Sequence, residues 1–141
     1  MKDYVLDANA VLLFLDPERT KHSEEMKNLF LLAQRGQARL FISVVNLGEV
    51  FYTLLKKIGE QRTHHVIQIL QNGVTVVEAN LEKTIHAATV KHQYDLGYAD
   101  SFAAALTLSL KATLVSADPD FEKLGKSLKW LRLPKFTGKT R

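Results

Sequence analysis

Apolar residues recur along the chain in two patterns, as short β-branched runs and as longer stretches with helical spacing. The short runs are rich in Val, Ile and Leu and contain few polar residues, which is typical of strands buried on both faces of a parallel sheet. They predict strands at residues 4–6, 40–45, 74–77 and 113–116, followed by an edge strand at residues 130–133.

The longer stretches between these runs carry the end signals of helices. Gly36, Gly59 and Gly73 each follow such a stretch, and glycine is common where a helix ends. Strands that alternate with helices predict an α/β domain, in which right-handed crossovers place helices on both faces of a central, mainly parallel sheet. The helices are expected at residues 22–35, 47–58, 60–71, 81–92 and 98–111.

Length and composition are those of an ordinary globular protein. The 141 residues are enough for one core, and the 46% of hydrophobic residues exclude a disordered chain. No linker-like stretch divides the sequence, so we expect a single domain over residues 1–141. Acids interrupt the N-terminal apolar residues, and the longest uncharged stretches are too short to cross a bilayer. With no cysteine present, we expect a soluble cytoplasmic protein without a signal peptide or membrane span.

Charge is distributed unevenly along the chain, whose net charge is +4 and whose pI is near 9.3. The C-terminal segment 123–141 carries seven positive charges and no acid, so residues 1–122 carry a net charge of −3. Such a basic end suits contacts with the phosphates of a nucleic acid, and it equally suits a solubilising terminus. The charge pattern alone leaves both interpretations open.

Three acids fall near the ends of predicted strands. Asp7 directly follows the first strand, Glu49 lies just inside the helix after the second, and Asp118 follows the fourth by two residues. The carboxyl ends of parallel strands meet at one edge of a sheet, where ligands bind. We therefore expect these acids to lie at one site.

Asp100 is a fourth candidate because of its apolar surroundings. It precedes the uncharged stretch 101–110, which is typical of a buried helix. A carboxylate in such a setting needs a basic side chain, the N–H groups of a helix start or a cation as partner.

Each acid also has a purely structural explanation. Asp7 and Asp118 are placed to cap helices. Asn46 and Glu49 have the spacing of a capping box, which is the better explanation of Glu49 taken alone. Asp120 suits the positive end of a helix dipole. Together, however, neighbouring carboxylates repel one another unless a cation compensates them, and oxygen ligands select Mg²⁺ or Mn²⁺.

Four segments carry these acids in an order and spacing that resemble a known family. They are residues 5–9, 43–50, 97–103 and 113–121. The family is the PIN domain, and the sequence is similar in particular to the VapC type of toxin ribonuclease. The resemblance extends from residue 4 to about residue 124 and implies a PIN-like α/β/α sandwich.

The resemblance also implies a site and an activity. A PIN-like ribonuclease cuts RNA phosphodiesters with Mg²⁺ or Mn²⁺, and the family's catalytic, metal-binding acids correspond to Asp7, Glu49, Asp100 and Asp118. Supporting roles fall on Asn9, on Ser116, which stands where threonine is common, and on Asp120 beside the last acid. Ser101 stands where alanine is common, and neither departure removes an oxygen ligand.

Partners follow from the same resemblance. It implies an RNA substrate, a homodimer and, for the toxins of type II toxin–antitoxin systems, a small antitoxin protein that occludes the site. Two other functions are open. A phosphatase with Asp7 as nucleophile is disfavoured by Asn9, because such enzymes usually carry a second Asp there. A non-catalytic PIN-like RNA-binding protein is disfavoured by the full set of acids.

Overall fold

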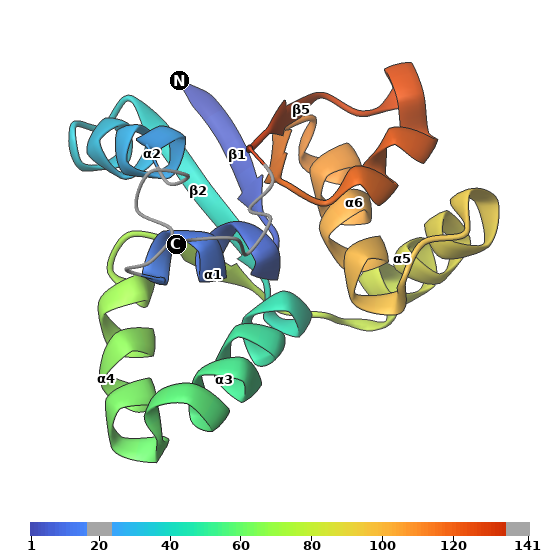
Figure 1. The fold of residues 1–141 in the computed structure, drawn as a ribbon. Coiled ribbons are helices and arrows are strands. Elements are labelled where there is room, and N and C mark those ends of the chain that lie inside the picture. Colours follow the sequence, from blue (N-terminus) through green and yellow to red (C-terminus); the bar gives the residue numbers. More distant parts are fainter. Residues whose placement is uncertain (17–23, 135–141) are drawn as a thin grey trace.

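The computed structural model describes residues 1–16 and 24–134, and a five-stranded parallel sheet lies at its centre (Figure 1). The strand order is β3-β2-β1-β4-β5, so the strand predicted at the edge is indeed an edge strand. All five predicted strands form, as β1 (Lys2–Leu6), β2 (Ala38–Ser43), β3 (Thr75–Val77), β4 (Thr113–Ser116) and β5 (Trp130–Arg132).

Helices connect the strands and form the outer layers. No helix of the described residues is both long and apolar enough to cross a membrane. The helical elements are α1 (Ala8–Leu15), α2 (Glu24–Gln34), α3 (Val44–Ile58), α4 (Glu60–Gln71), α5 (Leu81–Tyr94), α6 (Tyr98–Leu110) and the 3-10 segment η2 (Pro119–Ser127).

Among the described residues, the sequence pattern misplaced one helix start and missed one helix. α1 was not predicted, because its eight residues carry no glycine stop and merge with the apolar run of β1. Residues 44–45, expected in a strand, open α3, because the Ser43 side chain accepts a hydrogen bond from the Val45 N–H and caps that helix. The helix expected from residue 22 is observed from Glu24, and residues 22–23 lie outside the described residues.

Alternation along the strands divides the core into two halves. Leu6 and Val115 face a cluster that also contains residues of α1, α2, α3 and α4. Their neighbours Val5 and Leu114 face the opposite cluster, built from α5, α6 and η2. Figure 1 shows α4 and α5 on opposite sides of the molecule, whereas the first turn of α3 approaches α6. This arrangement confirms the α/β/α sandwich.

α6 is the most deeply buried helix of the second half. Residues 101–107 are all buried, as the uncharged sequence predicted. The small side chains of Ala103, Ala104 and Ala105 allow the helix to lie close to its neighbours. α6 therefore presents its first turn, including Asp100, from a well-packed support.

Lys111 follows α6 in the left-handed conformation, with φ +54°. An L side chain is strained there and glycine is not, so Lys111→Gly should raise the free energy of unfolding by about 0.5 to 1 kcal/mol. Urea denaturation measures the change. The same substitution at Lys57, in the last turn of α3, should instead lower stability because its backbone is helical. Destabilisation by Lys111→Gly would contradict the backbone assignment.

Candidate metal centre

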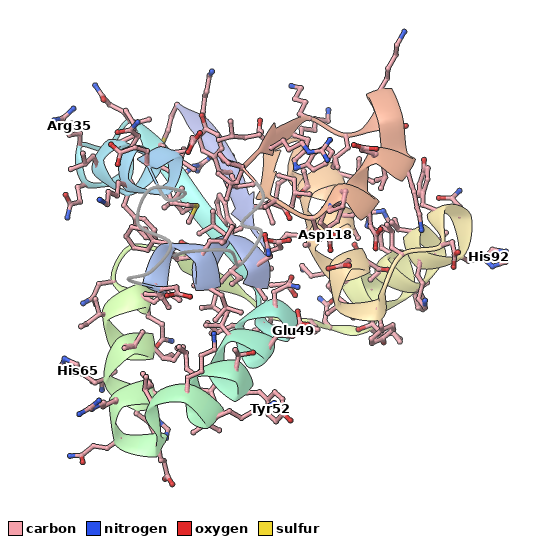
Figure 2. All side chains as sticks on the ribbon, viewed as in Figure 1. Arg35, Glu49, Tyr52, His65, His92 and Asp118 are labelled. Carbon is pink, nitrogen blue, oxygen red and sulfur yellow. The ribbon has the colours of Figure 1, made fainter. Side chains whose placement is uncertain are left out.

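The carboxyl edge of the sheet gathers acids from four separate elements. Asp7 joins β1 to α1, Glu49 lies on α3, Asp100 is in the first turn of α6, and Asp118 follows β4 at the start of η2. Figure 2 shows Glu49 at the end of α3 nearest to Asp118. The parallel topology therefore accounts for the meeting of residues that are far apart in sequence.

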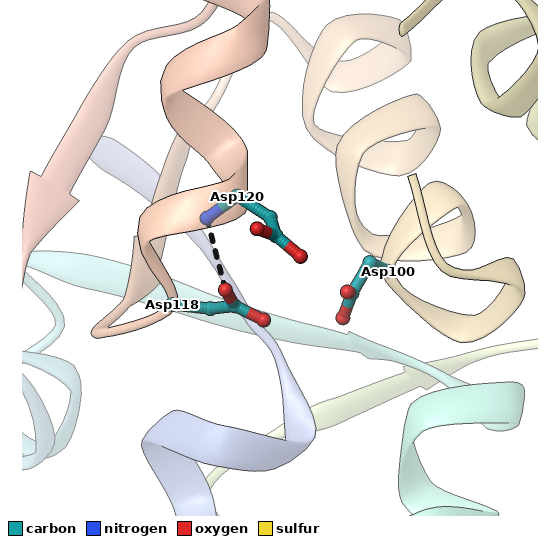
Figure 3. Close-up of side chains that lie close together, drawn as sticks. All are labelled: Asp100, Asp118 and Asp120. Atoms are coloured by element: carbon teal, nitrogen blue, oxygen red, sulfur yellow. Dashed lines mark hydrogen bonds between the residues drawn. The ribbon is translucent and has the colours of Figure 1, made fainter. Parts of the chain in front are cut away.

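Three of the acids are in direct proximity. Asp100, Asp118 and Asp120 each offer a carboxylate oxygen, and these oxygens lie within 4.8 Å of one another (Figure 3). Asp118 and Asp120 approach from η2, whereas Asp100 faces them from α6. The sequence placed Asp120 at the positive end of a helix dipole and gave it a supporting role beside Asp118, and its carboxylate lies in the same cluster.

Asp7 is buried, with only 1% of its surface exposed, and is close enough to Asp100 and Asp118 for their charges to raise its pKa. One carboxylate oxygen accepts a hydrogen bond of 2.8 Å from the Ala10 N–H, and so caps α1. The other accepts a hydrogen bond of 2.5 Å from the Ser116 hydroxyl. Asp7 is therefore a helix cap and, at the same time, an oriented member of the acid group.

Burial and mutual repulsion dominate the electrostatics. Burial raises the pKa of Asp7 to about 7, and the charges of Asp100 and Asp118 add to it, although its two hydrogen bonds oppose the shift. Burial also raises the pKa of Asp100 to about 6, with further contributions from Asp118, Glu49 and Asp120. All five acids thus share one electrostatic environment.

No base neutralises this group within the described residues. The salt bridges found there join Asp3 to Arg39, Glu24 to Lys27 and Glu122 to Arg132, all outside the cluster. The histidines labelled in Figure 2, His65 and His92, lie far from Asp118. The donor set is therefore made of carboxylate oxygens, which suit a hard divalent cation better than zinc or copper.

Ser116 and Asn9 brace the loop after β4. The Ser116 hydroxyl donates to Asp7 and accepts from the Asp118 N–H at 3.0 Å, so one side chain orients two acids. The Asn9 side-chain oxygen accepts from the Ala117 N–H, also at 3.0 Å. The supporting positions implied by the resemblance thus make contacts that can support the site.

Trp130 is a support that the sequence did not single out. Its indole N–H donates to the Ser116 carbonyl at 3.1 Å, from the edge strand β5. The only signal in the sequence was a lone tryptophan in a predicted strand, which says nothing of the strand it would contact.

The capping-box explanation of Glu49 is wrong. Ser43, and not Asn46, caps α3, and Asn46 lies inside the helix with no exposed surface. Glu49 is exposed, as its position off the apolar stripe of α3 predicted. Its side chain is free of the capping role and lies where it raises the pKa of Asp100.

Comparison with known proteins gives a family and a fold. The PIN domain family model matches residues 4–127. VapBC2 from Rickettsia felis, bound to a promoter DNA fragment, superposes with a TM-score of 0.74 and 18% identity over 93% of this chain and 98% of that chain. DNA-bound VapBC from Salmonella typhimurium superposes with a TM-score of 0.72 and 20% identity, over 94% of this chain and 98% of that chain. VapC20 of Mycobacterium tuberculosis, a toxin that cleaves the sarcin-ricin loop, superposes with a TM-score of 0.67 and 17% identity, over 86% of this chain and 95% of that chain. No curated protein matches by sequence.

The raised pKa of Asp100 predicts a pH-dependent effect of Asp100→Asn on the metal-free protein. The folded state retains the Asp100 proton to higher pH than the unfolded chain, so ionisation between about pH 4 and pH 6 lowers the free energy of unfolding. Asn cannot ionise. Relative to wild type, the variant should gain little below pH 4 and about 1 to 2 kcal/mol above pH 6, allowing for solvent screening. Urea denaturation in EDTA would contradict this if the difference did not grow with pH.

Proposed function

Because the chain belongs to the PIN-domain family, we propose that it is a Mg²⁺- or Mn²⁺-dependent endoribonuclease that hydrolyses RNA phosphodiesters. The observation that carries the proposal is the carboxylate trio of Asp100, Asp118 and Asp120, which no described base neutralises. A group of this kind is costly to keep unless it binds a cation.

In this proposal, Asp7, Glu49, Asp100 and Asp118 are the catalytic, metal-binding acids, and Asp120 joins them. When bound, the cation supplies an activated water and stabilises charge on the phosphate. Ser116 keeps Asp7 in one orientation, and capping of η2 does the same for Asp118, which accepts the Asp120 N–H at 2.9 Å. Glu49, which is exposed like Asp120, would complete the site or help to hold a second ion.

We further propose that the protein is the toxin of a type II toxin–antitoxin pair in the cytoplasm. Similar folds occur in VapBC complexes and in the sarcin-ricin-cleaving VapC20. This proposal includes a small antitoxin partner, a homodimer and one nuclease domain over residues 1–141. A gene for a short DNA-binding protein beside the coding sequence would support it.

The phosphatase alternative is weakened by the setting of Asp7. Both carboxylate oxygens accept hydrogen bonds and the residue is buried, which makes the carboxylate a weak nucleophile, although each oxygen keeps a lone pair that a cation can use. A non-catalytic RNA-binding protein differs from the proposal in its response to metal, and the cleavage assay below distinguishes the two.

Cleavage of single-stranded or looped RNA is the first expected outcome. EDTA should abolish it and excess Mn²⁺ should restore it, because the carboxylates act through the cation. Gel analysis of a labelled RNA measures the product. Cleavage that persists in chelator, with protein free of contaminating nucleases, would contradict the metal mechanism.

Asp100→Asn is compared with wild type in this cleavage assay and in melting curves recorded with and without Mn²⁺. Wild type should gain about 2.7 kcal/mol of stability at a Mn²⁺ concentration a hundredfold above Kd, and the variant should lose most of that gain together with its activity. Equal metal-induced melting shifts and equal cleavage in both proteins would remove Asp100 from the site.

The basic C-terminal segment should contribute to RNA affinity and not to chemistry. Lys126 and Lys129 are exposed, on η2 and just before β5, whereas Lys135 lies outside the described residues. Replacing all three with Gln should weaken RNA binding and lower the salt slope by about 0.7 for each phosphate that is no longer bound. Lys56→Gln with Lys57→Gln, on the far end of α3, is the control. An unchanged slope would assign the segment to solubility.

A further inference from the structure

We propose that Asn46 is a positioning residue that holds Glu49 beside Asp100, an inference that rests on the proposed metal-binding function. Asn46 lies on α3 and has no exposed surface. Its side-chain N–H₂ group donates to the Ala99 carbonyl at 3.0 Å and to a Glu49 carboxylate oxygen at 3.4 Å. One amide therefore ties Glu49 to the backbone next to Asp100.

This amide bridges the two halves of the molecule. α3 packs largely with the core half that contains Leu6, whereas α6 belongs to the half that contains Val5. The Asn46–Ala99 bond joins residues 53 positions apart, at the first turn of each helix. It thereby fixes where the α3 carboxylate stands relative to the α6 carboxylate.

Glu49 needs such a tether because its surroundings repel it. The side chain is exposed, and Asp100 is close enough for the two charges to interact. An exposed glutamate beside other carboxylates turns towards solvent unless a donor restrains it. Among the described residues, the Asn46 amide is the donor that Glu49 has.

Stability of the helix does not explain an asparagine at this position. The Asn46 side-chain oxygen is buried and has no hydrogen-bond partner, and a buried unsatisfied acceptor is unfavourable. Rotating the amide would not help, because it would turn an acceptor towards the Ala99 carbonyl. An apolar side chain would suit the helix better, so the useful part of Asn46 is its N–H₂ group.

The test compares Mn²⁺ binding with stability in the full-length, metal-free protein. Asn46→Leu keeps the volume and removes both donors. Its melting temperature should equal or exceed that of wild type, while calorimetric Mn²⁺ affinity should fall about 10-fold, as for Glu49→Gln. The variant that combines Asn46→Leu with Glu49→Gln should bind Mn²⁺ no more weakly than Glu49→Gln alone, because the two residues act as one unit.

Controls separate this proposal from a general packing effect. Thr107→Val removes another buried hydrogen bond, within α6, and should leave Mn²⁺ affinity unchanged. In NMR spectra of the metal-free protein, the Asn46 side-chain amide should exchange slowly with solvent and shift in Glu49→Gln. Rapid exchange of that amide would overturn the bridge itself.

The remaining outcomes are distinct. The positioning role would be overturned if Asn46→Leu bound Mn²⁺ as tightly as wild type. It would also be overturned if Asn46→Leu weakened Mn²⁺ binding by the same factor in the Glu49→Gln protein as in wild type. Loss of fold in Asn46→Leu would also overturn it, since the amide would then be a structural requirement. Absence of Mn²⁺ binding by wild type would refute the proposed function, and the inference with it, and is recognised from the wild-type titration alone.

Discussion

A carboxylate placed almost out of reach of solvent determines how the site is built. Asp7 is held by the Ala10 N–H on one side and by the Ser116 hydroxyl on the other, so its two oxygens link β1, α1 and β4. Such a group is tolerated in a core only with donors of this kind. Ser116 must then be fixed in turn, and the indole N–H of Trp130 fixes its carbonyl from β5. One buried acid thus explains contacts that reach the edge of the sheet.

The charges of the other acids repel one another and so oppose the packing that brings them together. Asp100 stands on a helix buried by small residues, and Asp118 and Asp120 stand on a segment anchored through Phe121 and Leu124. Apolar burial in this half of the core holds the carboxylates at short range despite their repulsion. Carboxylate repulsion lowers stability at one edge of the sheet and apolar packing in the adjoining core offsets it, an arrangement common at functional sites.

Local patterns in the sequence predicted the sheet and most helices, because β-branched runs and glycine stops are short-range signals. They failed where one pattern ran into another, as at residues 44–45, where an apolar run crosses from β2 into α3. They also gave Asn46 the wrong role, since its partner Ala99 is 53 residues away. They gave Asp120 a dipole role and a supporting role, and only the fold shows that Asp100 lies opposite it. The ends of predicted strands therefore indicate where a site lies, whereas contacts between residues far apart in sequence determine which side chains belong to it.

The order in which the acids occur along the chain has a consequence for synthesis. They range from Asp7 to Asp120, and β5, the last strand of the described residues, supplies the indole N–H that binds the Ser116 carbonyl. A nascent chain emerging from the ribosome therefore carries Asp7 and Glu49 long before their counterparts on α6 and η2 exist. The carboxylate cluster can assemble only after η2 has been synthesised, so the activity proposed for it would be absent from the nascent chain for most of translation.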